Sequence, residues 1–154
     1  MTPKSMKIKE IMQDKIVKIP KGTPYVEVAK ILKKNKISGA PVIDENDNLI
    51  GVVSEKDIFR VMYPEYKDFY ETPEAYQNLE DFEKEVVNNK NKLVEEFMTK
   101  DVIFVSPEDP IIKAASIIMS KGIHRVPVVE DGKLVGIVSR RDIYHTIFTK
   151  YLKI

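Results

Sequence analysis

The second half of this chain of 154 residues repeats the first half. The two copies keep one register from Met12, which aligns with Met98, to Ile58, which aligns with Ile143 after a single one-residue gap. One copy by itself is too short to bury enough apolar surface for stability. We therefore expect each copy to cover the apolar face of the other. The seam between two such copies is a natural place for a ligand.

The composition is that of a well-solvated protein with a substantial core. The chain is 43% hydrophobic and 32% charged, its net charge is +1, and it contains no cysteine. The near-neutral charge gives no indication of a nucleic-acid or membrane partner, and the absence of cysteine excludes disulfides and thiolate chemistry. No apolar run approaches the length of a membrane span, and no signal-peptide pattern is present. We expect a soluble, cytoplasmic protein.

Both copies predict the same order of elements, β-α-β-β-α, preceded by a short amphipathic lead. In the first copy these are a lead at 8–12, a strand at 15–19, a helix from Pro24, strands at 40–43 and 49–53, and a helix after Ser54. In the second copy they are a lead at 93–98, a strand at 101–105, a helix from Pro110, strands at 126–129 and 134–138, and a helix after Ser139. The pattern predicts an α/β (α+β) fold of two repeats packed with pseudo-two-fold symmetry.

The ends of the central helices also carry signals. Thr23 and Asp109 each precede a proline, so their side chains are expected to cap helices that begin at that proline. Gly122 stands where the second of these helices should stop, and Asn35 is expected to do the same in the first.

An insert rich in acidic and aromatic residues separates the copies. We expect repeat one at 1–63, the insert at 64–92 and repeat two at 93–154. A disordered acidic linker would not hold so many aromatics. A helix start at Thr72-Pro73, followed by an apolar face, predicts that part of the insert is helical and packs on the body or on a partner subunit. That face comprises Tyr76, Leu79, Phe82 and Val86.

The closing motifs of the copies point to a family. The first copy reads Gly-Val-Val-Ser-Glu-Lys-Asp over 51–57, and the second reads Gly-Ile-Val-Ser-Arg-Arg-Asp over 136–142. Each is preceded by a hairpin with an apolar-Pro-Val sequence and by the methionine-bearing lead. This arrangement resembles the cystathionine-β-synthase (CBS) domain family, whose tandem pair is often called a Bateman module. The resemblance covers nearly the whole chain except the insert. It implies a regulatory sensor of adenine nucleotides, or of S-adenosylmethionine and other adenosyl ligands, and it implies assembly as a homodimer.

Ser54 and Asp57, with their counterparts Ser139 and Asp142, carry two interpretations. One is structural, because Ser-x-x-Asp at a helix start resembles a capping box that satisfies free backbone N–H groups. The other is binding, because a helix N-terminus attracts phosphate and a nearby carboxylate accepts bonds from both ribose hydroxyls. The resemblance implies that the Asp holds the ribose and that the Ser lies near the phosphate.

The cationic residues are not shared equally between the copies. His124 and Arg125 precede the hairpin proline in copy two, where copy one has Ser38 and Gly39. A strand edge with solvated side chains is the plain interpretation, but the planar fork of arginine also suits phosphate. Beside the closing helices, copy two supplies Arg140 and Arg141, and copy one supplies Lys56. The sequence therefore predicts unequal sites, with the stronger anion attraction in copy two.

The first strand of each copy departs from the family pattern. Many members carry a Thr there that faces the ligand, and those places are Lys18 and Phe104 in this chain. Lys18 suits a phosphate, whereas Phe104 would stack on an adenine or fill its pocket. The resemblance further implies backbone contacts to adenine from Val17 and Ile103.

No catalytic or metal-binding pattern is found. His145 reads as a surface residue, and two histidines without cysteine have no convincing metal spacing. The sequence contains no phosphate loop and no supported Ser-His-Asp arrangement. The leading hypothesis is thus a non-catalytic sensor that needs no cofactor, binds AMP, ADP or ATP in the cleft between the repeats, and acts on a regulated partner protein. The alternatives are a structural or interaction module with degenerate nucleotide sites, and a sensor of an S-adenosylmethionine-type ligand.

Overall fold

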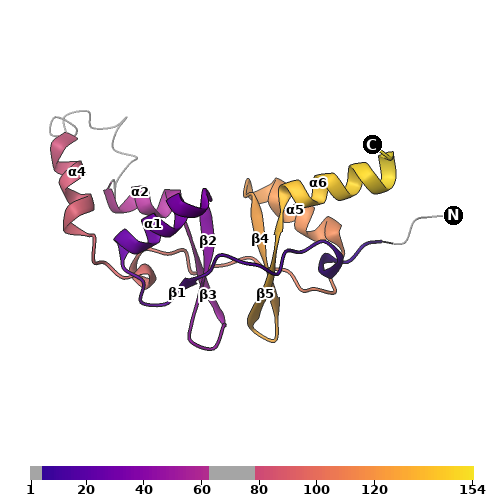
Figure 1. The fold of residues 1–154 in the computed structure, drawn as a ribbon, viewed down its shortest axis with the longest axis horizontal. Coiled ribbons are helices and arrows are strands. Elements are labelled where there is room, and N and C mark those ends of the chain that lie inside the picture. Colours follow the sequence, from indigo (N-terminus) through magenta and orange to yellow (C-terminus); the bar gives the residue numbers. More distant parts are fainter. Residues whose placement is uncertain (1–4, 63–78) are drawn as a thin grey trace. The chain divides into compact units, whose positions relative to one another are not determined.

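The computed structural model describes residues 5–62 and 79–154, which belong to two compact units (Figure 1). The described residues of unit 1 fall within Met1–Ile16, Asn46–Leu49 and Val102–Ile154. Those of unit 2 fall within Val17–Glu45 and Ile50–Asp101. Each unit therefore combines the main part of one copy with the lead of the other copy.

Unit 2 is built on a three-stranded sheet in the order β1-β2-β3. Its elements are β1 (Ile19–Pro20), α1 (Tyr25–Asn35), β2 (Gly39–Ile43), β3 (Leu49–Ser54), α2 (Glu55–Met62), α4 (Leu79–Asn88) and the 3-10 turn η3 (Val94–Glu96). β1 runs parallel to β2, with Ile19 opposite Val42. The hydroxyl of the buried Tyr25 donates to the backbone oxygen of Ile58 at 2.9 Å, which ties α1 to α2.

Unit 1 has the same plan. Its elements are the 3-10 turn η1 (Ile8–Glu10), α5 (Ile111–Lys121), β4 (Arg125–Glu130), β5 (Lys133–Ser139), α6 (Arg140–Ile147) and the π-helical turn η4 (Phe148–Leu152). β4 and β5 form an antiparallel hairpin that turns at Asp131 and Gly132, both with positive φ. Such an Asp-Gly pair favours the tight turn that matches strand twist.

Two apolar cores correspond to the two units. The core of unit 1 consists of Ile8, Val105, Ile111, Ala114, Ile118, Val126, Val128, Val138 and Ile143. The core of unit 2 consists of Ile19, Val28, Leu32, Ala40, Val42, Val53 and Val94. Ile8 from the first lead and Val94 from the second are both fully buried. The exchanged leads are thus part of the packing of the units that receive them.

The expected first strands are much shorter than the sequence indicated. Only Ile19 and Pro20 form β1, and the counterpart in unit 1 is an isolated parallel bridge between Val105 and Val128. The prediction of strands over 15–19 and 101–105 was wrong in extent, because only the last position of each segment meets the hairpin. The residues before it include the exposed Ile103 and Phe104.

The central helices begin one residue later than predicted. Pro24 and Pro110 are the residues that precede α1 and α5, and neither helix has a side-chain cap. The predicted capping by Thr23 and Asp109 was therefore wrong. The exchanged segments supply backbone acceptors instead: the N–H of Tyr25 donates to the carbonyl of Lys92 at 2.7 Å, and Ile111 donates to Met6 at 3.0 Å. These bonds satisfy helix-terminal donors that would otherwise need a cap.

The helix ends differ between the copies in a small way. Gly122 ends α5 in the left-handed region, as predicted. In α1 the left-handed residue is Lys36, the aligned position, rather than Asn35. The Asn35 amide instead donates to the carbonyl of Ile31 within the last turn.

The insert contributes a helix to unit 2. α4 contacts α2, so the described part of the insert lies against the body. The predicted helix start at Thr72-Pro73 and the side chains of Tyr76, Leu79 and Phe82 lie outside the described residues. Val86, from the same predicted face, is half-buried.

Candidate functional site

Each lead attaches to the strand that ends in the Ser-x-x-Asp motif. In unit 2, Thr99 and Val52 exchange two backbone hydrogen bonds of 2.8 and 2.9 Å. In unit 1, Gln13 and Ile137 exchange an equivalent pair of 2.8 and 2.9 Å. Two short bonds at one residue fix where the next side chain points. The lead therefore reaches the closing helix of the opposite copy at a defined position.

The motif glycines allow this close approach. A Cβ on Gly51 would lie 2.5 Å from the sulfur of Met98 and 2.9 Å from the carbonyl oxygen of Thr99. A Cβ on Gly136 would lie 2.7 Å from the sulfur of Met12. A side chain at either position would press against the lead, so these glycines serve packing.

Both carboxylate oxygens of Asp57, at the start of α2, accept hydrogen bonds from the protein. Its Oδ2 accepts from the backbone N–H and the hydroxyl of Ser54, at 2.9 and 3.2 Å. Its Oδ1 accepts from the Thr99 hydroxyl and from Arg60 Nη1, both at 3.1 Å. The Asp57 side chain is only 3% exposed, whereas that of Arg60 is 57% exposed. The carboxylate charge is thus neutralised by a neighbour that water also reaches.

Asp142 lies at the same point of α6 in a different setting. A full capping box is present, since Asp142 accepts from Ser139 N at 3.3 Å and its own N–H donates to Ser139 Oγ at 3.0 Å. The Nε2 of Gln13 lies 3.2 and 3.1 Å from the two carboxylate oxygens. The place of Arg60 is taken by His145, which instead accepts from Arg141. Within the described residues, Asp142 therefore has no cationic partner and is half-exposed.

The helix-start donors are mostly used by the chain itself. The N–H of Glu55 donates to the carbonyl of Ser38, and the N–H of Arg140 donates to that of His124. Asp142 N is taken by the capping box. The expectation that free N–H groups alone would attract a phosphate is weakened by these bonds. An anion at either helix start would therefore depend mainly on side chains for its binding.

The predicted cations of copy two meet in unit 1. Arg125 pairs with Ser139 across the hairpin, and the carbonyl of His124 receives the first N–H of α6. His124, Arg125, Arg140 and Arg141 are all exposed. The structure thus brings them together around the start of α6, beside a carboxylate with no counter-ion among the described residues.

The remaining predicted residues are divided between the units. Lys56 is exposed on α2, while Val17 and Lys18 are half-buried just before β1 of the same unit. Ile103 belongs to unit 1 and is 40% exposed, and its neighbour Phe104 is 52% exposed. An exposed Phe104 is available for stacking and does not fill a pocket of the described structure.

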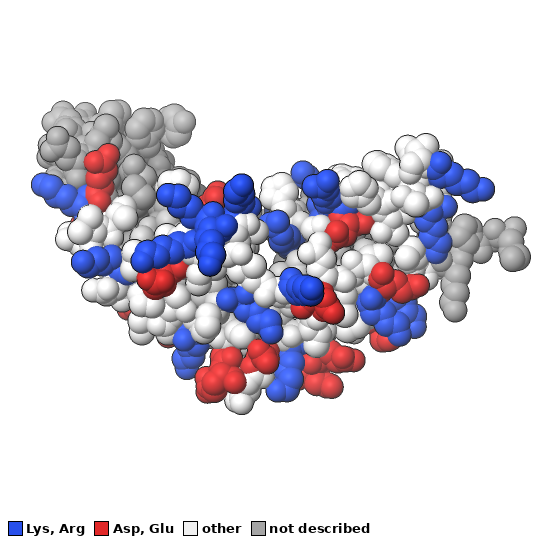
Figure 2. Space-filling view, in the orientation of Figure 1, with Lys and Arg blue, Asp and Glu red and all other residues white. Residues whose placement is uncertain are grey.

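Charges elsewhere on the surface are mixed. Figure 2 shows Lys and Arg gathered over α1, whose last turn carries Lys33 and Lys34, with both signs interspersed over the rest of that face. A small apolar hollow of about 240 Å³ in unit 1 is lined by Met6, Ile112, Tyr151 and neighbouring residues. None of the predicted site residues lines it. Its volume is below that of typical ligand sites.

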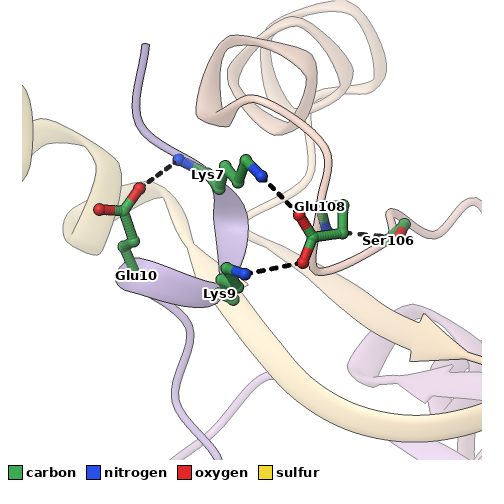
Figure 3. Close-up of polar contacts among 5 residues, drawn as sticks. All are labelled: Lys7, Lys9, Glu10, Ser106 and Glu108. Atoms are coloured by element: carbon green, nitrogen blue, oxygen red, sulfur yellow. Dashed lines mark hydrogen bonds and ion pairs between the residues drawn. The ribbon is translucent and has the colours of Figure 1, made fainter. Parts of the chain in front are cut away.

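Within unit 1, an ion-pair cluster joins the first lead to the segment before α5 (Figure 3). The ammonium groups of Lys7 and Lys9 donate to separate oxygens of Glu108 at 2.6 and 2.8 Å. The hydrogen bonds from Lys7 and Lys9 lower the pKa of Glu108 to about 2, and the same contact raises the pKa of Lys9. In unit 2 the equivalent junction is a bond from Gly22 N–H to the Glu95 carboxylate. The two junctions therefore differ in kind: lysine side chains bind the carboxylate in unit 1, and a backbone N–H binds it in unit 2.

Sequence reasoning missed the three residues that distinguish the two aspartates. Gln13 and Thr99 are aligned positions directly after the lead methionines, and both carry a hydrogen-bonding side chain. A polar side chain at the same position after both apolar leads was a signal of a hydrogen-bonding role. The partner of that side chain is apparent only once each lead is seen to pack on the opposite copy. Arg60, which aligns with His145, lies three residues after Asp57, and this i,i+3 spacing was the available signal for the ion pair.

Two negative findings apply to the described residues only. No group of three or more His, Cys, Asp or Glu residues among them is arranged to hold a metal ion. Among the helices at 5–62 and 79–154, none is both long and apolar enough to pass through a bilayer.

Comparison with known proteins agrees with this architecture. The model of the CBS domain matches residues 8–64 and 94–148. The chain belongs to the CBS domain family, and its two repeats form a tandem CBS pair. CBS domains are generally regulatory modules without catalytic activity.

The proteins similar to this chain include two whose structures were solved with a bound ligand. An uncharacterized protein, MJ1426, from Methanocaldococcus jannaschii is 34% identical over 92% of this chain and 91% of its own length. The chloroplastic CBSX1 of Arabidopsis thaliana is 33% identical, and this chain spans 54% of it. The CBS pair of MJ0100, solved with 5′-methylthioadenosine and S-adenosyl-L-methionine, has a TM-score of 0.68 and 27% identity over 96% of this chain and 99% of its own. The structure of CBSX2 with AMP shares the fold, with a TM-score of 0.71 and 24% identity over 93% of this chain and 96% of its own.

Proposed function

We propose that this chain is a non-catalytic regulatory module that binds an adenine nucleotide, AMP, ADP or ATP, at the start of α6 in unit 1. The observation that carries the proposal is the setting of Asp142, a half-exposed carboxylate without a cationic partner among the described residues. A ribose diol requires such an acceptor. The adenosyl ligands in the structures of MJ0100 and CBSX2 support the class of ligand.

The surrounding charge favours a ligand with phosphate. Arg125, Arg140 and Arg141 are exposed around the same helix start, together with His124. Arginine donates two parallel bonds to a phosphate, and these bonds are stronger than neutral ones. 5′-Methylthioadenosine has no anionic group, and the single carboxylate of S-adenosylmethionine is accompanied by a positive sulfonium and an ammonium group. Both ligands therefore gain less from these residues than a nucleotide does.

The start of α2 is less suited to bind a nucleotide than the start of α6. Asp57 is buried, satisfied by four hydrogen bonds and paired with Arg60. A ribose there would have to displace protein partners, and Lys56 is the one cation of the predicted set on that helix. We therefore propose one working nucleotide site per chain, with Val17 and Lys18 belonging to the degenerate position and Ile103 to the working one.

A module without chemistry of its own must act through another protein or another copy. A ligand shifts a protein only through unequal affinity for two states. We propose a cytoplasmic homodimer that signals to a regulated partner. The exposed apolar side chains of Tyr144, Phe148 and Leu152 along α6 and η4 support an association surface in unit 1. Light scattering after gel filtration measures the oligomer directly.

Isothermal titration with AMP, ADP, ATP, S-adenosylmethionine and 5′-methylthioadenosine tests the ligand. The matched pair Arg141→Ala and Lys56→Ala tests the location, because the two residues occupy aligned positions on α6 and α2. We expect a stoichiometry of one and micromolar affinity for a nucleotide, which corresponds to about −8 kcal/mol. Arg141→Ala should weaken nucleotide binding about fivefold or more, and Lys56→Ala should leave it unchanged.

Salt gives a second, independent measure of the phosphate contacts. Binding through exposed arginines weakens as ionic strength rises, because screening shortens the range of the interaction. Equal effects of the two substitutions would contradict the assignment to unit 1. Absence of binding to all five compounds would contradict the proposed function and favour an interaction module with degenerate sites.

A further inference from the structure

We propose that the Gln13 side chain is an internal competitor for the ribose at Asp142, and so sets the affinity and the diol specificity of the site in unit 1. The inference rests on the proposed function. It adds a residue from the lead of the opposite copy, which the Ser-x-x-Asp motif does not contain. In the structure the amide of Gln13 contacts Asp142, and it must leave when a vicinal diol binds.

The geometry of the contact carries the proposal. Gln13 Nε2 lies 3.2 Å from Oδ1 and 3.1 Å from Oδ2 of Asp142, so one amide spans both carboxylate oxygens. The two hydroxyls of a ribose need those same two oxygens. One oxygen, Oδ2, also accepts from Ser139 N at 3.3 Å. A carboxylate offers about four acceptor positions, and one is used by Ser139 N, so an amide and a diol that each use two compete for the remaining three.

The backbone of Gln13 is held by hydrogen bonds to a strand, whereas its side chain is exposed to solvent. Two backbone bonds to Ile137 hold the residue at β5, and the Met12 side chain packs over Gly136 beside it. The Gln13 side chain itself is exposed. Release of the amide into water therefore breaks only its contacts with Asp142 and leaves the docked lead in place. The backbone of Gln13 is thus the fixed part of the residue, and its side-chain amide is the part that a ligand can displace.

The aligned contact in unit 2 is of another kind. Thr99 donates its hydroxyl to Asp57 at 3.1 Å, and Arg60 binds the same oxygen at 3.1 Å. Removal of the threonine hydroxyl leaves Asp57 buried and still paired with arginine. Unit 2 therefore provides a matched control: Gln13→Ala frees an acceptor at Asp142, whereas Thr99→Ala frees none that a ribose reaches.

The test uses the full chain and five titrations. Wild type, Gln13→Ala and Thr99→Ala are titrated with AMP, and wild type and Gln13→Ala also with 2′-deoxy-AMP. Loss of the competing bond should make Gln13→Ala bind AMP about threefold to tenfold more tightly, which is the usual net worth of one hydrogen bond. Thr99→Ala should bind AMP within about twofold of wild type. 2′-Deoxy-AMP lacks one of the two hydroxyls and should gain less than AMP from Gln13→Ala.

A spectroscopic measurement covers the case in which Gln13→Ala does not fold. In wild type, the side-chain amide resonance of Gln13 should shift when AMP is added, and it should shift less with 2′-deoxy-AMP. Unchanged or weaker AMP binding by Gln13→Ala, equal gains for both nucleotides, or a Gln13 amide that does not respond to bound AMP would each overturn the inference. If wild type binds AMP and one of these results is obtained, the inference fails but the proposed function is retained. Failure of both proteins to bind any nucleotide overturns both proposals.

Discussion

The glycines of the repeated motif give a prediction whose size follows from the space around each of them. In Gly51→Ala the new Cβ would lie 2.9 Å from the carbonyl oxygen of Thr99, in addition to 2.5 Å from the Met98 sulfur. A thioether can rotate away, but the carbonyl is held by two backbone bonds to Val52. In Gly136→Ala the nearest backbone atom, Gln13 O, is 3.1 Å away and the tighter contact is the flexible Met12 sulfur at 2.7 Å.

These distances place the two substitutions at opposite ends of the usual cost of overpacking, which is about 1–3 kcal/mol. Replacing glycine by alanine also stabilises by about 0.7 kcal/mol through the unfolded chain. The free energy of unfolding should therefore fall by about 2 kcal/mol in Gly51→Ala and by about 0.5 kcal/mol in Gly136→Ala. At about 2–4 °C per kcal/mol for a chain of this size, the expected decreases in Tm are about 4–8 °C and about 1–2 °C.

Urea unfolding followed by far-ultraviolet circular dichroism measures both losses, with thermal unfolding as a second measurement. Ser116→Ala, at an exposed position of α5, is the control and should change stability by less than about 0.5 kcal/mol. A double-mutant cycle with Met12→Ala should recover much of the Gly136→Ala loss, because the methionine is the main obstacle there. A Gly136→Ala loss as large as that of Gly51→Ala would refute the reasoning.

Two further predictions concern charge. Because its hydrogen bonds to Lys7 and Lys9 lower the pKa of Glu108 to about 2, its contribution to lead docking should be complete above pH 4.5, and it should be lost as pH falls toward 2. A side-chain carboxyl titration by NMR should show that midpoint near 2, and the Lys7→Ala/Lys9→Ala double variant should return it toward 4.5; an unchanged midpoint would contradict the ion-pair geometry. Asp57→Ala should reduce the free energy of unfolding by about 3 kcal/mol, because it leaves buried donors without their acceptor, whereas Asp142→Ala should cost about 1 kcal/mol. Chemical denaturation measures the difference, and equal losses would show that burial at Asp57 is not decisive.

The repeat made most of the fold predictable. Both copies carry hairpins and closing helices within a residue or so of the predicted positions, because alternating apolar residues and turn signals are local properties. The strands at 15–19 and 101–105 were overestimated because an extended apolar segment becomes a strand only where a neighbour pairs with it. The prediction of caps at Thr23 and Asp109 was wrong because backbone carbonyls from the exchanged segments accept the hydrogen bonds of the helix-terminal N–H groups.

The candidate site divides in the same way. The aligned sequences by themselves identified Ser139 and Asp142 as a motif and identified the cations that only the second copy carries. The pairing of Arg60 with Asp57 is a local i,i+3 contact on α2 that the spacing suggests, but the aligned sequences could not show how deeply Asp57 is buried. They also could not show that Gln13 reaches Asp142, since 129 residues separate the two in the chain.

The sequence by itself determined that this protein is a pair of like units with unlike charges. Periodicity, turn residues and the repeated motif are local, and each copy carries them in full. Only the tertiary structure decided that the leads are exchanged, so that each motif glycine and each motif aspartate meets a residue from the opposite copy. The physical reason is that a carboxylate takes its partners from whatever lies within hydrogen-bond distance, and packing brings those groups together across the chain.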